Sequence, residues 1–188
     1  MEVKIVEVGP RDGLQNENRA LSVDDKARLV RDLIDAGLRE IEAGSFVSPR
    51  NVPQMANSGV LLERVPPATG VRYRALVPNL RGMEAALAAR VDEVAIFASA
   101  SETFSQRNIN CSIDDSFARF GPIMDIAATA GIPVRGYLSC AFGCPYEGNV
   151  ATSAVVSLTA RLLTLGCYEV AVSDTIGIGT PGDTRRLL

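Results

Sequence analysis

An arginine and an aspartate stand side by side directly after the first apolar run of the chain. Val3 to Val8 is rich in β-branched residues and Gly9-Pro10 ends it, so the pattern predicts a strand followed at once by a turn that carries Arg11 and Asp12. A guanidinium can hold a planar carboxylate or polarise a carbonyl, whereas a carboxylate can bind a hard divalent cation or accept a proton. In an α/β fold, ligands bind at this end of the strands.

Other polar side chains lie on the last residues of further expected strands or just beyond them: Glu7, Glu42, Tyr137 and Asp174. Each of them alone is more often structural than catalytic. An arginine among several carboxylates at one rim, however, favours a metal site over a core. Glu7 and Glu42 also fit a second interpretation, a buried ion pair that orients Arg11, because buried charges need partners.

The elements that would position these residues follow a repeated order: an apolar run, a loop with Gly or Pro, and a segment of helical period that ends on Gly. The strands are expected to begin near residues 3, 40, 72, 93, 134 and 169. Strands that alternate with helices at this spacing predict an α/β fold with a parallel sheet. The pattern alone leaves open whether that sheet is doubly wound or part of a barrel.

The helices have clear end signals. Ser22 and Ser112 are expected N-caps, and Gly37 and Gly131 are expected to end the helices that follow them. Residues 99–111 are polar and too long for a tight loop, which predicts a functional loop or a short accessory helix.

Length and composition bound the class of protein. A chain of 188 residues with 47% hydrophobic content predicts one globular domain over residues 1–188. The net charge of −3 argues against a nucleic-acid partner, because phosphate contacts need clustered basic residues. No apolar run approaches the length of about 20 residues that a membrane span needs, so we expect no membrane contact and a cytoplasmic location.

The four cysteines are expected to be free thiols in such a chain. Cys140 and Cys144 have a spacing that could begin a zinc site. The chain has neither a second pair nor any histidine to complete a tetrahedral set, so the spacing does not favour structural zinc.

The stretch from Glu7 to Glu17, which reads EVGPRDGLQNE, resembles the hydroxymethylglutaryl-CoA lyases. These enzymes belong to the metal-dependent TIM-barrel lyases and synthases, most of which share only Arg-Asp-Gly followed by Gln. The longer form is typical of the lyase branch. Further matches follow in family order at residues 45–49, 108–112, 143–148 and 174–182.

The resemblance implies a (β/α)8 TIM barrel, of which this chain would supply about six βα units. It also implies cleavage of 3-hydroxy-3-methylglutaryl-CoA, an acyl-CoA substrate, to acetoacetate and acetyl-CoA, a step of leucine degradation. Asp12 would be a ligand of Mg²⁺ or Mn²⁺, and Arg11 would bind substrate and stabilise the enolate that forms. Glu42 and Asp174 would support this catalytic group, Gln15 and Tyr137 would contact substrate, and the full-length protein would be a homo-oligomer.

Several residues that the family uses are absent. The lyases complete the metal site with a His-x-His pair and an Asn, and they use a Cys in a glycine-rich loop as proton donor. Cys144 has a similar local setting but matches an earlier segment of the family, so we do not assign it as catalytic. A helix that begins at Thr180 has no stop signal, and six strands are two short of a barrel. We therefore expect the N-terminal part of a longer chain, truncated after the sixth strand, which would be inactive and prone to association if made alone.

Two alternatives remain. A related condensing enzyme or aldolase would also carry Arg-Asp-Gly, but the residues Leu14 to Glu17 are not expected in it. A barrel fragment that lacks metal ligands could also be a non-catalytic binding protein. Continuation of the reading frame into a His-x-His strand would discriminate between these readings.

Overall fold

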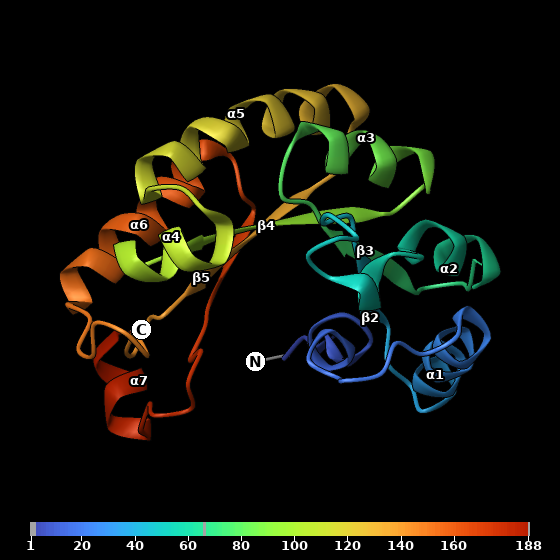
Figure 1. The fold of residues 1–188 in the computed structure, drawn as a ribbon, viewed down its shortest axis with the longest axis horizontal. Helices are drawn as coiled ribbons and strands as arrows, with labels where there is room; N and C mark the ends of the chain where they lie inside the picture. The colour runs from blue at the N-terminus through green and yellow to red at the C-terminus, as the bar shows by residue number, and fades with distance from the viewer. Residues whose placement is uncertain (1–2, 66, 188) are drawn as a thin grey trace. The chain divides into compact units, whose positions relative to one another are not determined.

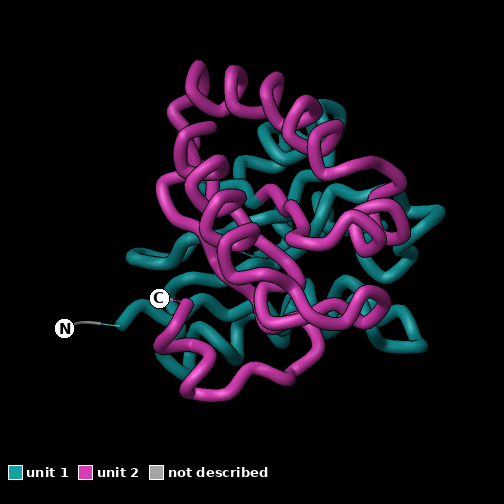
Figure 2. Tube along the Cα trace, turned by 90° about the vertical axis from the view of Figure 1, so that its left-hand side faces the viewer, with its two compact units in different colours: residues 1–95 teal, residues 96–188 magenta. Residues whose placement is uncertain are grey.

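A computed structural model describes residues 3–65 and 67–187. The chain divides into two compact units, Met1–Ala95 and Ile96–Leu188, which Figure 2 shows in different colours. The single domain expected over residues 1–188 stays a prediction.

The first unit is built from parallel strands and the helices that connect them (Figure 1). Strand β2 pairs in parallel with β1 and β3, and β3 pairs in parallel with the first residues of β4. The strands are β1 (Val6–Glu7), β2 (Glu40–Ser45), β3 (Arg72–Leu76) and the first three residues of β4 (Glu93–Ser99), and the helical elements are η1 (Gly9–Gly13), α1 (Val23–Asp35), η2 (Pro53–Met55), α2 (Ser58–Arg64) and α3 (Leu80–Ala88).

Helix α1 forms where its cap and its apolar stripe predict it. The Ser22 hydroxyl accepts a hydrogen bond from the backbone N–H of Asp25 at 3.1 Å, which satisfies one of the donors left unpaired in a first helical turn. Ala27 and Val30 are fully buried in a cluster with Ile41 and Leu61. Burial of this face is what holds the helix against the sheet.

The second unit continues the alternation. Strands β5 and β6 pair in parallel, with Tyr137 opposite Ala171. Helix α5 buries Phe117 and Phe120 and ends at Gly131, whose φ of +68° suits glycine. The elements are α4 (Glu102–Ile109), α5 (Ile113–Ala130), β5 (Val134–Ser139), α6 (Thr152–Leu165), β6 (Glu169–Val172) and α7 (Pro181–Leu187).

The structure corrects the first strand. The strand expected from Val3 is formed only at Val6–Glu7, because the ladder to β2 covers only those two residues. Val3 and Ile5 are 73% and 64% exposed, so their β-branched side chains have no packed face that would order them. Between residues 99 and 111 the accessory helix is the alternative that the structure confirms, as α4. No helix within residues 3–65 and 67–187 is long and apolar enough to cross a membrane.

All four cysteines are buried free thiols, as expected, and two of them should make the fold sensitive to alkaline pH. Burial raises the pKa of Cys167 to about 11, and burial likewise raises the pKa of Cys140 to about 11, from an ordinary value of 9.0. Between pH 9 and about 11, these two thiols lose their protons in the unfolded chain but keep them in the folded protein. The stability that is present below pH 9 should therefore fall as the pH rises from 9 to about 11.

The measurement is the urea midpoint at a series of pH values from 8 to 11. A Cys167→Ala variant removes one of the two titrating thiols, and its midpoint should fall less steeply with pH than that of the unchanged protein. Equal slopes in the two proteins would show that Cys167 does not contribute to the alkaline loss.

Candidate functional site

A tight turn fixes Arg11 at the end of β1. The residues Gly9–Gly13 form a single π-helical turn, in which the backbone N–H of Asp12 donates to the Val8 carbonyl at 2.7 Å. The Glu7 carboxylate accepts from the backbone N–H of Gly9 at 2.6 Å. A Cβ atom at position 9 would lie 2.7 Å from that carboxylate oxygen, so a larger residue there would require the Glu7 side chain to move.

Arg11 is held between two carboxylates. Its Nη1 donates to Asp12 Oδ1 at 2.6 Å, and its Nε donates to Glu42 Oε1. Glu42 is fully buried and Arg11 nearly so, whereas the Asp12 side chain is 56% exposed. The structure thus supports the second interpretation of Glu42, a buried partner that orients the guanidinium. The Arg11–Asp12–Glu42 cluster presents an oriented cation next to an accessible carboxylate.

The strand that carries Glu42 is bent just after it. The register of β2 against β3 shifts between Glu42 and Gly44, which is a β-bulge. Beyond it, the Ser45 N–H donates to Ser58 Oγ at 3.0 Å, and the Ser58 hydroxyl donates to the Met55 carbonyl at 2.8 Å. A Cβ at Gly44 would lie 2.6 Å from Ser58 Oγ, so this glycine lets α2 approach the strand and fix its end.

The donors near Arg11 fit part of a site for a hard divalent cation. Asp12 Oδ1 is engaged by Arg11, and a carboxylate has a second oxygen for metal binding. The Gln15 Oε1 atom, three residues on, is buried and has no hydrogen-bond partner within the described part of the chain. Residues 3–65 and 67–187 contain no cluster of three His, Cys, Asp or Glu side chains that could hold a metal. Asp12 therefore fits as one ligand of a set, not as a complete site.

Tyr137 and Asp174 belong to the second unit. Tyr137 lies on β5 beside Arg135, whose guanidinium carbon is 4.9 Å from the ring centroid. Asp174 follows β6, and its two carboxylate oxygens accept the backbone N–H groups of Ile178 and Gly179 at 3.1 and 2.8 Å. Asp174 thus organises its own loop. The catalytic and substrate-binding roles of these two residues, and of Gln15, stay predictions.

Cys144 is buried and engaged in local hydrogen bonds. Its Sγ lies 3.0 Å from Ser101 Oγ and 3.4 Å from the backbone nitrogen of Tyr146. Burial raises the pKa of this thiol, but the hydrogen bonds from Ser101 and the neighbouring backbone outweigh that effect and lower it below its ordinary value. These contacts fix Cys144 within its loop.

Sequence reasoning missed a second ionic cluster. Arg74 on β3 is fully buried, forms an ion pair with Glu93 in which Nε lies 2.6 Å from Oε1, and donates through Nη2 to Glu40. Charged residues inside otherwise apolar strands were the available signal, because a charge in such a position must find a partner. The sequence could not indicate which charges pair.

Comparison with known proteins accounts for nearly the whole chain. A family described as HMGL-like matches residues 2–188. A 3-hydroxy-3-isohexenylglutaryl-CoA/hydroxy-methylglutaryl-CoA lyase from Pseudomonas aeruginosa is 57% identical over all of this chain and 62% of its own length. A hydroxymethylglutaryl-CoA lyase from Pseudomonas mevalonii is 57% identical over 98% of this chain and 62% of its own. The chain thus spans less than two thirds of these relatives.

Solved structures agree. The crystal structure of hydroxymethylglutaryl-CoA lyase from Pseudomonas aeruginosa matches with a TM-score of 0.96 at 57% identity, over 99% of this chain and 62% of that one. An HMG-CoA lyase from Acinetobacter baumannii, solved in complex with coenzyme A and 3-methylmalate, matches with a TM-score of 0.94 at 33% identity, over 98% of this chain and 60% of that one. The predicted fold, an α/β chain that forms part of a TIM barrel, is confirmed.

Proposed function

The chain belongs to the HMGL-like family, and on that premise we propose that the protein cleaves 3-hydroxy-3-methylglutaryl-CoA to acetoacetate and acetyl-CoA. The observation that carries the proposal is the Arg11–Asp12–Glu42 cluster, in which a nearly buried guanidinium is oriented beside an accessible carboxylate at the end of β1. Relatives at 57% identity named as hydroxymethylglutaryl-CoA lyases support it.

Arg11 acts on the charge that develops during cleavage. When the carbon–carbon bond breaks, the electron pair moves toward the thioester carbonyl, and negative charge builds on its oxygen. A guanidinium fixed before the reaction stabilises that charge without having to reorganise. Glu42 contributes as a positioning residue, because its buried carboxylate fixes Nε and with it the plane of the guanidinium.

A divalent cation, Mg²⁺ or Mn²⁺, is the cofactor that the family resemblance implies. When bound, it would lower the pKa of the substrate hydroxyl and so ease the proton loss that begins cleavage. Asp12 would hold it through a carboxylate that is half exposed and already oriented by Arg11. The neutral amide oxygen of Gln15 is a further hard donor nearby in sequence, which we assign to substrate.

The acyl-CoA class of substrate is supported by the relative that was solved with coenzyme A. The relative from Pseudomonas aeruginosa is also named for 3-hydroxy-3-isohexenylglutaryl-CoA, which has a longer branch at the same carbon. We therefore propose that both thioesters be assayed. Homo-oligomeric assembly and a cytoplasmic location are part of the same proposal. The relatives include bacterial proteins and others named as mitochondrial.

The test is to measure Mn²⁺ binding and lyase turnover in the protein as it is encoded. Asp12→Ala should weaken Mn²⁺ binding by about tenfold or more, because the loss of one ligand costs more than the loss of an outer-sphere contact. Exhaustive chelation should remove turnover, and added Mn²⁺ should restore it.

The matched control is Asp35→Ala, which removes an exposed carboxylate at the end of α1. It should leave metal binding and turnover unchanged. Turnover that survives chelation, or Mn²⁺ affinity equal in the Asp12→Ala variant and the unchanged protein, would contradict the metal-dependent lyase. Condensation of an acyl-CoA with a keto acid in place of cleavage would favour the related condensing enzyme.

A further inference from the structure

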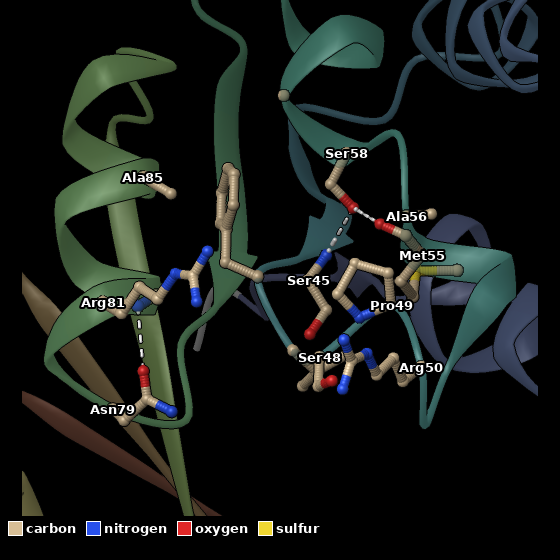
Figure 3. Close-up of a pocket in the computed structure, with 14 residues that line it drawn as sticks. Ser45, Ser48, Pro49, Arg50, Met55, Ala56, Ser58, Asn79, Arg81 and Ala85 are labelled. Atoms are coloured by element: carbon tan, nitrogen blue, oxygen red, sulfur yellow. Dashed lines mark hydrogen bonds between the residues drawn. The ribbon is translucent and has the colours of Figure 1, made fainter.

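A pocket of about 710 Å³ lies in the first unit between the loop that follows β2 and the helices α2 and α3 (Figure 3). Its lining does not include Arg11, Asp12 or Glu42. The volume lies within the range of about 300–1,000 Å³ that small-molecule sites have. The pocket is therefore large enough for an organic ligand, and its chemistry can be read from the side chains around it.

One hydroxyl in the pocket is buried and without a partner. Ser45 is 1% exposed and lines the pocket, and its Oγ has no hydrogen-bond partner among the described residues. The nearby Ser58 Oγ already accepts a hydrogen bond from the Ser45 N–H and donates its own proton to the Met55 carbonyl. It therefore has no proton left to donate to Ser45 Oγ. Leaving a buried hydroxyl without a hydrogen bond costs free energy, so a ligand whose polar atom bonds to Ser45 Oγ would be stabilised there.

Two arginines face the same space from opposite walls. In Figure 3, Arg81 extends from the first turn of α3 and Arg50 extends from the loop after β2, and both guanidinium groups point toward the region around Ser45. Both side chains are exposed, and neither has an ion-pair or hydrogen-bond partner in the part of the chain that the structure describes. The described residues that line the pocket include no Asp or Glu. The pocket is thus positive in a chain whose net charge is −3.

Most of the remaining lining residues are apolar. Phe46, Met55 and Ala85 contribute carbon surface. A Cβ at Gly82 would lie 3.0 Å from the Phe46 carbonyl oxygen and 2.8 Å from Pro78, and a Cβ at Gly59 would touch the Phe46 ring at 3.8 Å. Gly82 therefore lets α3 pack closely against the loop after β2. The carbon surface of Phe46, Met55 and Ala85 is where an apolar group of a ligand would bind.

We infer that this pocket is a binding site for a small phosphate monoester with an apolar body, separate from the Arg11–Asp12–Glu42 cluster. Two guanidinium groups offer several N–H donors to a dianionic tetrahedral group, and the Ser45 hydroxyl offers one more at its base. A carboxylate carries one negative charge on two coplanar oxygens, whereas a phosphate monoester carries up to two on three oxygens that point in different directions, so the phosphate suits donors on separate walls better. The nearby start of α3 adds a favourable dipole for an anion.

The experiment is a calorimetric titration of the protein, as it is encoded, with phenyl phosphate, with inorganic phosphate and with benzenesulfonate. Phenyl phosphate should bind saturably, and it should bind more tightly than inorganic phosphate, which lacks the ring, and benzenesulfonate, which carries a single charge. Arg50→Met and Arg81→Met should each weaken its binding by about tenfold or more, and Ser45→Ala by about fivefold, as expected for hydrogen bonds to a charged group.

Arg31→Met is the matched control, because it removes an equally exposed arginine on α1, which does not line the pocket. It should leave the affinity for phenyl phosphate unchanged. A loss in Arg31→Met equal to that in Arg81→Met would show general attraction between charges and overturn the site. So would equal affinity for the three ligands, an unchanged affinity in Ser45→Ala, or no saturable binding. Direct binding is the readout throughout, so failure of the proposed lyase activity would not affect the result.

Discussion

Arg11→Gln is expected to lower kcat by about 10²- to 10³-fold, the cost of removing one group that stabilises a developing oxyanion. The KM should change by only a few-fold, because the thioester oxygen carries its full negative charge only as the bond breaks. The measurement is steady-state cleavage of 3-hydroxy-3-methylglutaryl-CoA at saturating Mn²⁺. A raised KM with an intact kcat would instead place Arg11 in ground-state binding.

Glu42 provides an internal check on that result. If its carboxylate acts by orienting Arg11, Glu42→Gln should lower kcat in the unchanged protein but add little in an Arg11→Gln background. Additive losses would mean that Glu42 contributes separately, as the catalytic role predicted from the family resemblance implies. Arg31→Gln, at an exposed position on α1, should leave kcat and KM unchanged.

Much of the fold could be predicted because its signals are local. Five of the six strands begin at the expected residues, since apolar runs bounded by Gly, Pro and caps depend on neighbours in sequence. The caps at Ser22 and Ser112 formed as expected for the same reason. The strand expected from Val3 was too long, because the number of residues that join a ladder depends on the strand alongside.

The arrangement of charges depended on contacts distant in sequence. The motif around Arg11 indicated the cation and Asp12, and the idea of a buried partner at Glu42 came from the requirement that buried charges pair. The bulge between Glu42 and Gly44 determines where Ser45 lies, and its local signal, the glycine inside the strand, does not indicate how the register shifts. The pocket that holds the Ser45 hydroxyl therefore could not be found before the packing of α2 on β2 was known.

Arg74→Met is expected to destabilise the first unit by about 3–5 kcal/mol, the usual cost of removing one partner of a buried ion pair. Arg74 and Glu93 are both fully buried, and the variant leaves the Glu93 carboxylate without the cation that lies 2.6 Å from it. Methionine is shorter than arginine but similar to it in volume, and its side chain is flexible, so a cavity accounts for little of the loss. The measurement is the free energy of unfolding from urea titration followed by circular dichroism.

A double variant distinguishes two origins of that destabilisation: the cost of leaving a buried carboxylate without its cation, and the loss of attraction between the two charges. If most of it comes from the stranded carboxylate, neutralising the partner should recover part of it, so Arg74→Met with Glu93→Gln should be more stable than Arg74→Met alone. Arg28→Met breaks an exposed pair with Asp25 and should cost no more than about 1 kcal/mol, because water screens both groups. If Arg74→Met costs as little as Arg28→Met, the buried cluster does not stabilise the strands. If the double variant is less stable than either single variant, the attraction between the two charges, and not the cost of a buried carboxylate without its cation, dominates the energy of this pair.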